Sequence, residues 1–175
     1  MKLKAAQLRS SDPTESQLAK VKRRQIYIIC DNILDTYNIG SIFRLADAVA
    51  ASKVYLCGNN IALPPYHRIT KAAVGTDKWV PWEHVRTTKV AILKLRKQVP
   101  GIKIVAIEQD KKSVDYRTFD YGEPIAFIVG HETTGVSRGV LDLADVIVEL
   151  PIYGVNVSLN VMVSLAIVLY RAIEK

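Results

Sequence analysis

Short apolar runs alternate with amphipathic stretches along most of this chain. Continuous apolar runs, such as residues 26–30, are typical of strands buried on both faces of a parallel sheet. Stretches with apolar residues three and four positions apart, such as 39–51, are typical of helices that bury one face. We therefore predict strands at 26–30, 54–57, 79–85, 102–107, 124–129 and 146–150, and helices at 15–24, 39–51, 87–99, 137–144 and 157–172. This alternation predicts an α/β fold whose sheet is mainly parallel and flanked by helices.

The closing stretch places polar residues inside an apolar segment. The strand expected at 146–150 ends at Pro151, and after Gly154 the chain resumes with an apolar run that holds Ser158 and Asn160. A buried polar side chain without a partner costs about 1–3 kcal/mol, so both need hydrogen bonds. Ser158 could cap the closing helix and Asn160 could be a satisfied core amide. The other interpretation is that they face a ligand.

The helix expected at 39–51 carries one arginine outside its apolar stripe. Arg44 points away from the core and follows soon after the carboxyl end of a buried strand, the edge where ligands bind in open α/β sheets. Taken alone, Arg44 is better explained as a surface charge, and Asn38 with Gly40 as a turn before a helix. The apolar stripe itself consists of Ile39, Ile42, Phe43, Ala46 and Val49.

Length and composition favour one globular domain with an N-terminal arm. A chain of 175 residues with 49% hydrophobic residues can bury a sizeable core. The apolar run at 161–170 is too short to span a bilayer, and residues 1–24 lack the apolar segment of a signal peptide, so we expect a cytoplasmic protein. Cys30 and Cys57 each end a strand-like run without metal-binding spacing, which predicts buried, reduced thiols.

Positive charge is concentrated in two segments. The net charge is +7, with seven Lys and Arg against two Asp and Glu in residues 1–24, and nine against two in 66–103. This segregation fits a surface that binds a polyanion, although a solvated basic face explains it equally. We predict that residues 1–24 form a basic arm and 25–175 a single domain, and that the irregular segment 58–78 is functional or partly helical.

Three segments together resemble the motifs of a known family. Residues 38–46 read Asn-Ile-Gly-Ser-Ile-Phe-Arg-Leu-Ala, residues 130–135 read Gly-His-Glu-Thr-Thr-Gly, and residues 151–161 read Pro-Ile-Tyr-Gly-Val-Asn-Val-Ser-Leu-Asn-Val. In order and spacing they resemble the three motifs of the SpoU/TrmH branch of the SPOUT RNA methyltransferases. The resemblance covers nearly everything after residue 25. Three motifs in one short chain are specific, whereas any one alone would be weak.

The resemblance implies a fold and a cofactor. Family members carry a carboxyl-terminal trefoil knot, a feature that is otherwise very rare, so the loops around Glu108, Gly130 and 150–156 are expected to form one pocket. The implied cofactor is S-adenosyl-L-methionine, whose sulfonium already activates the methyl group, and no cluster with metal-ligand spacing is present in the sequence. Carried over by motif position, the cofactor-binding residues are Ile107, Gly130, Leu150 and Leu159.

The acceptor implied by the resemblance is a ribose 2′-hydroxyl of RNA. Arg44 matches the catalytic arginine, and because arginine stays protonated we expect it to grip a phosphate and stabilise the forming alkoxide. Asn38 would position the phosphate or the arginine. Glu132, Ser158 and Asn160 match the remaining catalytic positions and would shape the site and orient the substrate.

Partners follow from the same comparison. The closing helix is apolar on nearly every side, which predicts burial by a second copy, and the family forms such homodimers. Small family members often act on transfer RNA, which we therefore expect as the substrate, with ribosomal RNA open. Met162 replaces a serine common in the third motif, and His131, Thr133 and Thr134 replace the usual small or charged residues of the second.

Two other functions compete with this prediction. A catalytically inactive knotted RNA-binding module would keep the fold, but the joint presence of the five matched catalytic residues argues against it. A nucleotide-binding α/β enzyme would need a Gly-x-Gly-x-x-Gly turn or a Gly-Lys-Ser/Thr loop, and the sequence has neither.

Overall fold

The computed structural model describes residues 2–10 and 12–174. Its centre is a seven-stranded sheet in the order β3-β2-β1-β6-β4-β7-β5, in which every pair of neighbours runs parallel. The predicted α/β fold with a parallel sheet is confirmed. The strands are β1 Arg24–Asp31, β2 Ala51–Cys57, β3 Trp82–Val85, β4 Lys103–Ile107, β5 Val114–Asp115, β6 Ile125–Gly130 and β7 Val146–Glu149.

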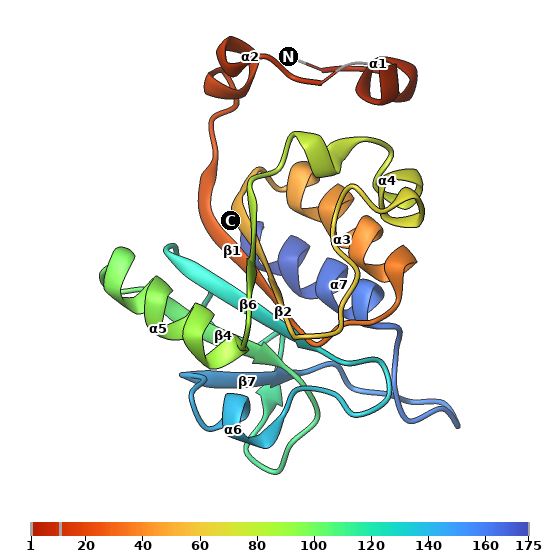
Figure 1. Cartoon of the computed structure of the whole chain (residues 1–175). Helices are drawn as coiled ribbons and strands as arrows, with labels where there is room; N and C mark the ends of the chain where they lie inside the picture. Colours follow the sequence, from red (N-terminus) through yellow and green to blue (C-terminus); the bar gives the residue numbers. More distant parts are fainter. Residues whose placement is uncertain (1, 11, 175) are drawn as a thin grey trace.

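Helices cover both faces of the sheet (Figure 1). Helices α3 (Thr36–Ala48), α4 (His67–Ala73) and α7 (Val161–Ile173) contribute to the core on one face, and a 3-10 turn, η1 (Thr76–Lys78), follows α4. Helices α5 (Thr88–Gln98) and α6 (Arg138–Leu141) contribute to the core on the other face. Two cores on one sheet explain why its strands are continuously apolar.

Strand β1 shows how successive residues supply the two cores. Ile28 and Cys30 belong to the core beneath α3 and α7, whereas Ile29 belongs to the core beneath α5 and α6. Cys30 and Cys57 are both buried and free, as predicted. Burial raises the pKa of both thiols, that of Cys57 to about 12, which keeps them protonated at neutral pH.

Helix α3 begins three residues before the predicted start. Asp35 caps it, because its carboxylate accepts hydrogen bonds from the backbone N–H groups of Tyr37 at 2.7 Å and Asn38 at 3.3 Å. The helix also ends earlier than predicted, at Ala48, since β2 already begins at Ala51. The cap places Asn38 inside the first turn of the helix.

Helix α7 begins four residues after the predicted start. Asn160, not Ser158, caps it, and the Asn160 side-chain oxygen accepts a hydrogen bond from the Met162 N–H at 2.9 Å. Residues 153–159 form an exposed loop before the cap, so the prediction that the helix starts at 157 is wrong. Within α7 only Leu165, Val168 and Leu169 are buried.

The N-terminal segment holds two short helices in place of the one expected at 15–24. They are α1 (Ala5–Ser10) and α2 (Glu15–Ala19), neither with a buried residue, and β1 begins at Arg24. Figure 1 shows both helices at the end of the molecule nearest α4. A salt bridge of 2.6 Å joins Asp12 to Lys78 of η1, so this segment touches the domain at that end.

Three smaller elements also differ from the sequence-based prediction. Residues 58–78, expected to be irregular or partly helical, contain α4 and η1. The four-residue α6 is half the length predicted for 137–144. Strand β5 was not predicted, because its two residues are too short to give a hydrophobic pattern.

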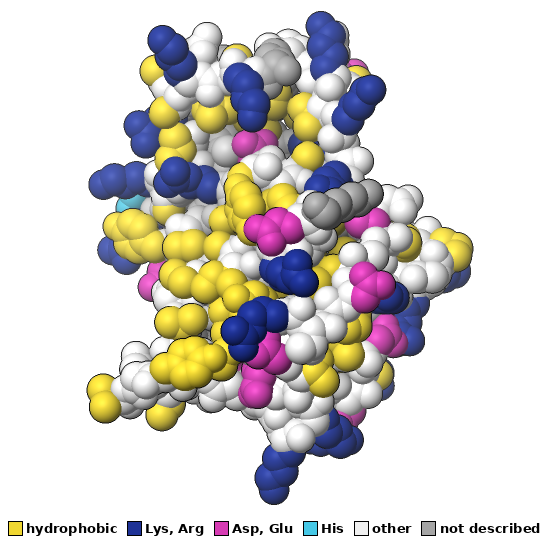
Figure 2. All heavy atoms as spheres, turned by 180° about the vertical axis from the view of Figure 1, so that it is seen from behind, with side chains coloured by type: hydrophobic (Ala, Val, Ile, Leu, Met, Phe, Trp, Pro, Cys, Tyr) yellow, Lys and Arg dark blue, Asp and Glu magenta, His cyan; other side chains and the backbone are white. Residues whose placement is uncertain are grey.

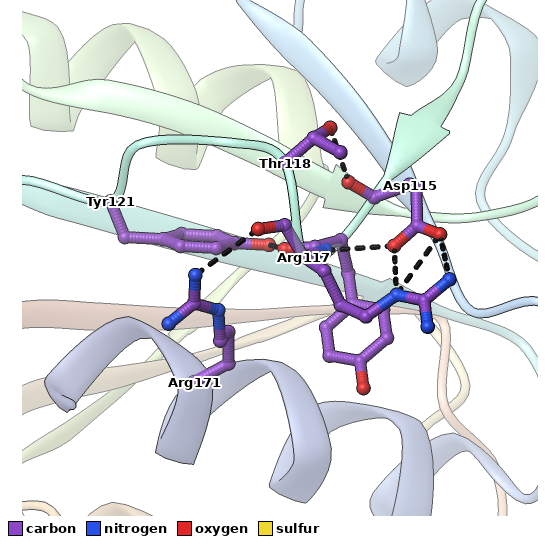
Figure 3. Close-up of polar contacts among 6 residues, drawn as sticks. Asp115, Arg117, Thr118, Tyr121 and Arg171 are labelled. Atoms are coloured by element: carbon purple, nitrogen blue, oxygen red, sulfur yellow. Dashed lines mark hydrogen bonds and ion pairs between the residues drawn. The ribbon is translucent and has the colours of Figure 1, made fainter.

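Polar contacts fasten the segment after β5 to the closing helix (Figure 3). The Arg171 guanidinium on α7 donates to the Arg117 carbonyl oxygen at 3.1 Å, and the Tyr121 hydroxyl donates to the Tyr116 carbonyl oxygen at 2.8 Å. The Arg117 guanidinium forms an ion pair with Asp115 and lowers the pKa of that carboxyl group to about 2. The Arg171 bond joins α7 to the segment that follows the edge strand β5, and the other two contacts lie within β5 and that segment.

None of the helices in the described ranges is long and apolar enough to cross a membrane. The trefoil knot and the division at residue 24 into an arm and a domain remain predictions.

The contact between α3 and α4 depends on Gly40. A Cβ atom there would lie 2.5 Å from the Ile69 carbonyl oxygen and 2.6 Å from the Ala72 Cβ. We predict that Gly40→Ala lowers the free energy of unfolding by about 1–3 kcal/mol, measured by urea denaturation, because α4 must shift. Gly122→Ala is the control, since a Cβ there meets nothing within 4 Å. Equal stability of the two variants would contradict this packing.

Candidate functional site

A cavity of about 510 Å³ opens at the carboxyl ends of β4, β6 and β7. Three separate loops form its walls, as predicted: the segment after β4, the turn at 130–135 and the segment 149–160. Ligands of open α/β sheets bind at this edge. Seven of the nine predicted site residues line the cavity: Ile107, Gly130, Glu132, Leu150, Ser158, Leu159 and Asn160.

A chain of side-chain hydrogen bonds joins the three motif segments. The Asn38 amide nitrogen donates to the Glu132 carboxylate at 3.0 Å, and the Asn160 amide nitrogen donates to the Asn38 side-chain oxygen at 3.0 Å. Asn38 is 7% exposed, so both of its polar groups are satisfied away from solvent. Residues 94 and 122 positions apart are thereby fixed relative to one another.

Glu132 is also held by backbone groups at the start of α3. Its carboxylate accepts hydrogen bonds from the N–H of Leu34 at 3.2 Å and of Asp35 at 3.0 Å. Burial raises the pKa of Glu132, but the hydrogen bonds from Asn38 and from backbone N–H groups outweigh burial, so the net pKa is lowered. The second motif therefore presents an ionised carboxylate whose oxygens are directed at the first motif.

Two glycines allow the turn of the second motif to fold tightly. A Cβ at Gly130 would lie 2.2 Å from backbone atoms of Gly135 and Val136. Gly135 has a φ of +66°, and a Cβ there would meet the Glu108 carboxylate at 2.1 Å. His131 closes the turn, because its Nδ1 accepts the Thr133 N–H at 3.0 Å. His131 therefore has a structural role in the turn.

Glu108 and Gln109 belong to the site although they lie outside the three motif segments. Glu108 accepts hydrogen bonds from the N–H groups of Val136 at 2.8 Å and Gln109 at 2.9 Å. The Gln109 side chain donates to the Val157 carbonyl oxygen at 2.8 Å, which ties the exposed loop to the cavity wall. A usable signal was present, since both residues directly follow the buried strand β4.

Ser158 lines the cavity from the exposed loop, and the interpretation of Ser158 as a helix cap is wrong. Its backbone N–H donates to the Asn156 side-chain oxygen at 3.4 Å. Asn160 is not a core amide either, because it caps α7 at the edge of the cavity. The Ser158 hydroxyl has no hydrogen-bond partner among the described residues, which leaves it available to a ligand.

Arg44 is the predicted site residue that neither lines the cavity nor bonds to the network. It is exposed on α3, as its position outside the apolar stripe predicted, and it does not line the cavity. Within residues 2–10 and 12–174 it forms neither a hydrogen bond nor an ion pair. A single chain therefore assembles the cavity and the Asn38–Glu132–Asn160 network without bringing Arg44 to them.

Comparisons with known proteins agree on one family. The sequence profile of the SpoU rRNA Methylase family matches residues 25–170. The chain is 31% identical over 163 residues to the tRNA (guanosine(18)-2'-O)-methyltransferase of Aquifex aeolicus, covering 89% of this chain and 72% of that enzyme. It is 34% identical over 155 residues to the enzyme of the same name from Escherichia coli strain K12, covering 86% and 64%.

A solved structure is similar throughout the fold. The AdoMet-bound rRNA methyltransferase from Sinorhizobium meliloti superposes with a TM-score of 0.77 at 29% identity, covering 94% of this chain and 59% of that one. The chain thus spans less than two thirds of the Escherichia coli and Sinorhizobium meliloti proteins.

The hydrogen-bond network predicts how stability depends on pH. We predict that Asn38→Ala lowers the free energy of unfolding at pH 7 by about 1–3 kcal/mol, because Glu132 and Asn160 lose their shared partner. The folded pKa of Glu132 lies below its unfolded value of about 4.3, so its contribution is complete above that value and disappears as the pH falls through the folded pKa. The difference in free energy of unfolding between the wild-type protein and Asn38→Ala should therefore become smaller below about pH 4.

Urea denaturation from pH 7 to pH 3 measures this difference. Asn59→Ala is the matched control, since Asn59 is exposed and forms no side-chain hydrogen bond with the described residues. A loss of stability for Asn38→Ala that stays constant across the pH range would show that the Glu132 carboxylate is not stabilised by Asn38.

Proposed function

Because the chain belongs to the SpoU rRNA methylase family, we propose that it is an S-adenosylmethionine-dependent RNA ribose 2′-O-methyltransferase. Transfer RNA is the favoured substrate, since the Aquifex aeolicus and Escherichia coli relatives are named as transfer RNA methyltransferases. Ribosomal RNA is the second candidate, because the Sinorhizobium meliloti neighbour is named as an rRNA methyltransferase.

The observation that carries this proposal is the contact between all three motif segments at one cavity. Asn38, Glu132 and Asn160 come from three different motifs and are joined by two side-chain hydrogen bonds of 3.0 Å. Buried polar networks are costly when incomplete, and this one is complete. The joint presence of Asn38, Arg44, Glu132, Ser158 and Asn160 disfavours an inactive RNA-binding module.

The cavity fits the proposed cofactor. Its volume of about 510 Å³ lies in the usual range of small-molecule sites, roughly 300–1,000 Å³. Gly130 lies on the cavity wall, and Ile107, Leu150 and Leu159 add apolar surface. These four residues would hold S-adenosylmethionine. When bound, that cofactor supplies a methyl group already activated by its sulfonium.

The protein's own residues would prepare the acceptor. A ribose hydroxyl becomes nucleophilic as its proton leaves, and the negative charge on its oxygen needs a cation nearby. We assign this role to Arg44, which stays protonated and which also suits a flanking phosphate. Ser158 would orient the ribose with its free hydroxyl. Asn38, Glu132 and Asn160 would hold the three loops in register around it.

A homodimer would bring Arg44 to a cavity. In one chain Arg44 lies outside the cavity lining, so we propose that a second copy supplies the arginine. Large hydrophobic side chains are exposed on the loop before α7, on α7 itself and around the start of α3, and Figure 2 shows hydrophobic side chains gathered on this face. They are Leu34, Tyr37, Tyr153, Val155, Val157, Leu159, Val163 and Tyr170.

RNA would bind at the basic end of the molecule. Figure 2 shows Lys and Arg side chains gathered at the end that carries the N-terminal helices. Arg68 and Lys71 of α4 lie at the same end, where Asp12 meets Lys78. Seven basic residues in 1–24 add to this surface. We propose that the RNA backbone follows it, and that the protein works in the cytoplasm, where such RNA is found.

Methyl transfer tests the proposed function directly. Purified protein would be incubated with radiolabelled S-adenosylmethionine in two reactions. One reaction contains total transfer RNA and the other total ribosomal RNA, both from cells that lack the modification. Label should enter one RNA class at one nucleotide. Cofactor binding without transfer to either RNA would favour the inactive module.

Arg44→Ala should reduce the methylation rate by roughly 100-fold or more, the scale expected for removing one preorganised electrostatic group. Because Arg44 is exposed and unpaired among the described residues, its loss should leave unfolding and cofactor affinity nearly unchanged. Arg44→Lys keeps the positive charge but loses the planar guanidinium. A methylation rate above that of Arg44→Ala would indicate that charge alone contributes, and an equally low rate would indicate that the bidentate geometry of arginine is needed. Near-full turnover of Arg44→Ala would contradict the assignment.

Light scattering should report twice the chain mass of 19.5 kDa at micromolar concentration. Val163→Glu places a charge on the exposed face of α7 and should shift the protein towards the monomer, since a buried unpaired charge is costly. Val90→Glu is the matched control on α5, on the opposite side of the sheet. A monomeric wild-type protein would contradict the proposed dimer.

Deleting residues 1–20, or replacing Arg68 and Lys71 by alanine, should weaken RNA binding and flatten its dependence on salt. Each lost phosphate contact should reduce the slope of log affinity against log salt by about 0.7–0.9. Replacing Lys89 and Lys97 of α5 removes the same charge from the other face and should have the smaller effect. If the Arg68/Lys71 and Lys89/Lys97 double variants had equal salt-dependence slopes, the RNA would bind at another surface.

A further inference from the structure

The cavity carries a charge opposite to that of the chain. The protein has 24 Lys and Arg against 17 Asp and Glu, yet none of the residues lining the cavity is Lys or Arg. Three are glutamates: Glu108 after β4, Glu132 in the turn after β6, and Glu149 at the end of β7. They lie on three different segments of the cavity wall, so the charge of the lining is net negative.

These carboxylates are not neutralised within the described chain. None of the three forms an ion pair with a described Lys or Arg, whereas nearby Asp110 pairs with Arg138 at 2.8 Å. Glu108 accepts two backbone N–H groups. Glu149 has no side-chain hydrogen-bond partner among the described residues. A concave site lined by one sign of charge focuses its potential on whatever ligand enters.

The proposed cofactor and its product differ in the charge that such a site detects. S-Adenosylmethionine carries a sulfonium, an ammonium and a carboxylate, for a net charge of one positive unit at neutral pH. Its demethylated product is a thioether with no net charge. We propose that Glu108 and Glu149 make this cavity selective for the cationic cofactor over its neutral product. This inference rests on the proposed function and adds a specificity role for two residues outside the motifs.

The selectivity has a consequence for turnover. Once the methyl group has been transferred, the positive charge at sulfur is lost, and the attraction to the cavity wall is lost with it. The spent cofactor would then be displaced by fresh cofactor, even at similar concentrations. A single arginine from a partner copy would offset one of the three carboxylates and leave the cavity net negative.

The effect should be modest for each carboxylate and sensitive to salt. Partly exposed charges interact weakly in water, so each glutamate should contribute roughly a 2- to 5-fold preference, the scale of an exposed ion pair. Screening extends over about 8 Å at physiological ionic strength, so added salt should reduce the preference. Glu132 is excluded from the test because it belongs to the network with Asn38.

Calorimetry on the full-length protein tests the inference without measuring activity. Three ligands separate charge from shape: S-adenosylmethionine, S-adenosylhomocysteine, and sinefungin, in which an amine supplies the positive charge without a methylsulfonium. Wild-type protein should bind both cations more tightly than the neutral thioether. Glu149→Gln should reduce that preference by about 2- to 5-fold, and Glu108→Gln should act in the same direction.

Glu174→Gln, at the end of α7 and outside the cavity, is the matched control and should leave the preference unchanged. Glu108→Gln could also disturb the bond to Val136, so Glu149→Gln decides the result. Binding of all three ligands with equal affinity, or a preference that survives both substitutions, would overturn the selectivity role and leave the proposed function standing. Failure of wild-type protein to bind any of them would overturn both.

Discussion

The hydrogen bonds from Asn160 to Asn38 and from Asn38 to Glu132 are the constraint on which the site depends. They join the start of α3, the turn after β6 and the cap of α7, which lie far apart along the chain. Asn160 serves twice, because its oxygen caps α7 while its nitrogen reaches Asn38. The geometry of the site and the start of the last helix are therefore set by one residue.

Close backbone packing makes that network reachable. The parallel register of β1 and β6 brings Asp31 opposite Gly130, so α3 and the turn of the second motif begin beside each other. Gly130 lets the turn fold back onto Val136, and Glu108 fastens it from the neighbouring strand. The same edge collects three carboxylates in a basic protein, which gives the cavity an electrostatic character of its own.

Much of this organisation was predictable, and the failures have physical causes. Buried parallel strands are apolar on both faces, so the sheet could be predicted from its runs, whereas β5 was too short to leave one. Seven of nine site residues line the cavity because motif order identifies loops well. The start of α7 was misplaced because serine and asparagine are comparable caps, and the choice depends on the distant partner Asn38. Arg44 could not be placed because the proposed role needs a second chain.

The position of the transferred methyl group on the RNA tests ribose 2′-O-methylation most directly. RNA labelled by the wild-type protein would be hydrolysed with alkali, which cleaves beside a free 2′-hydroxyl but cannot cleave beside a methylated one. A ribose 2′-O-methyltransferase would leave the label in an alkali-resistant dinucleotide. Label recovered in single nucleotides would place the methyl group on a base, and would contradict a site built for ribose.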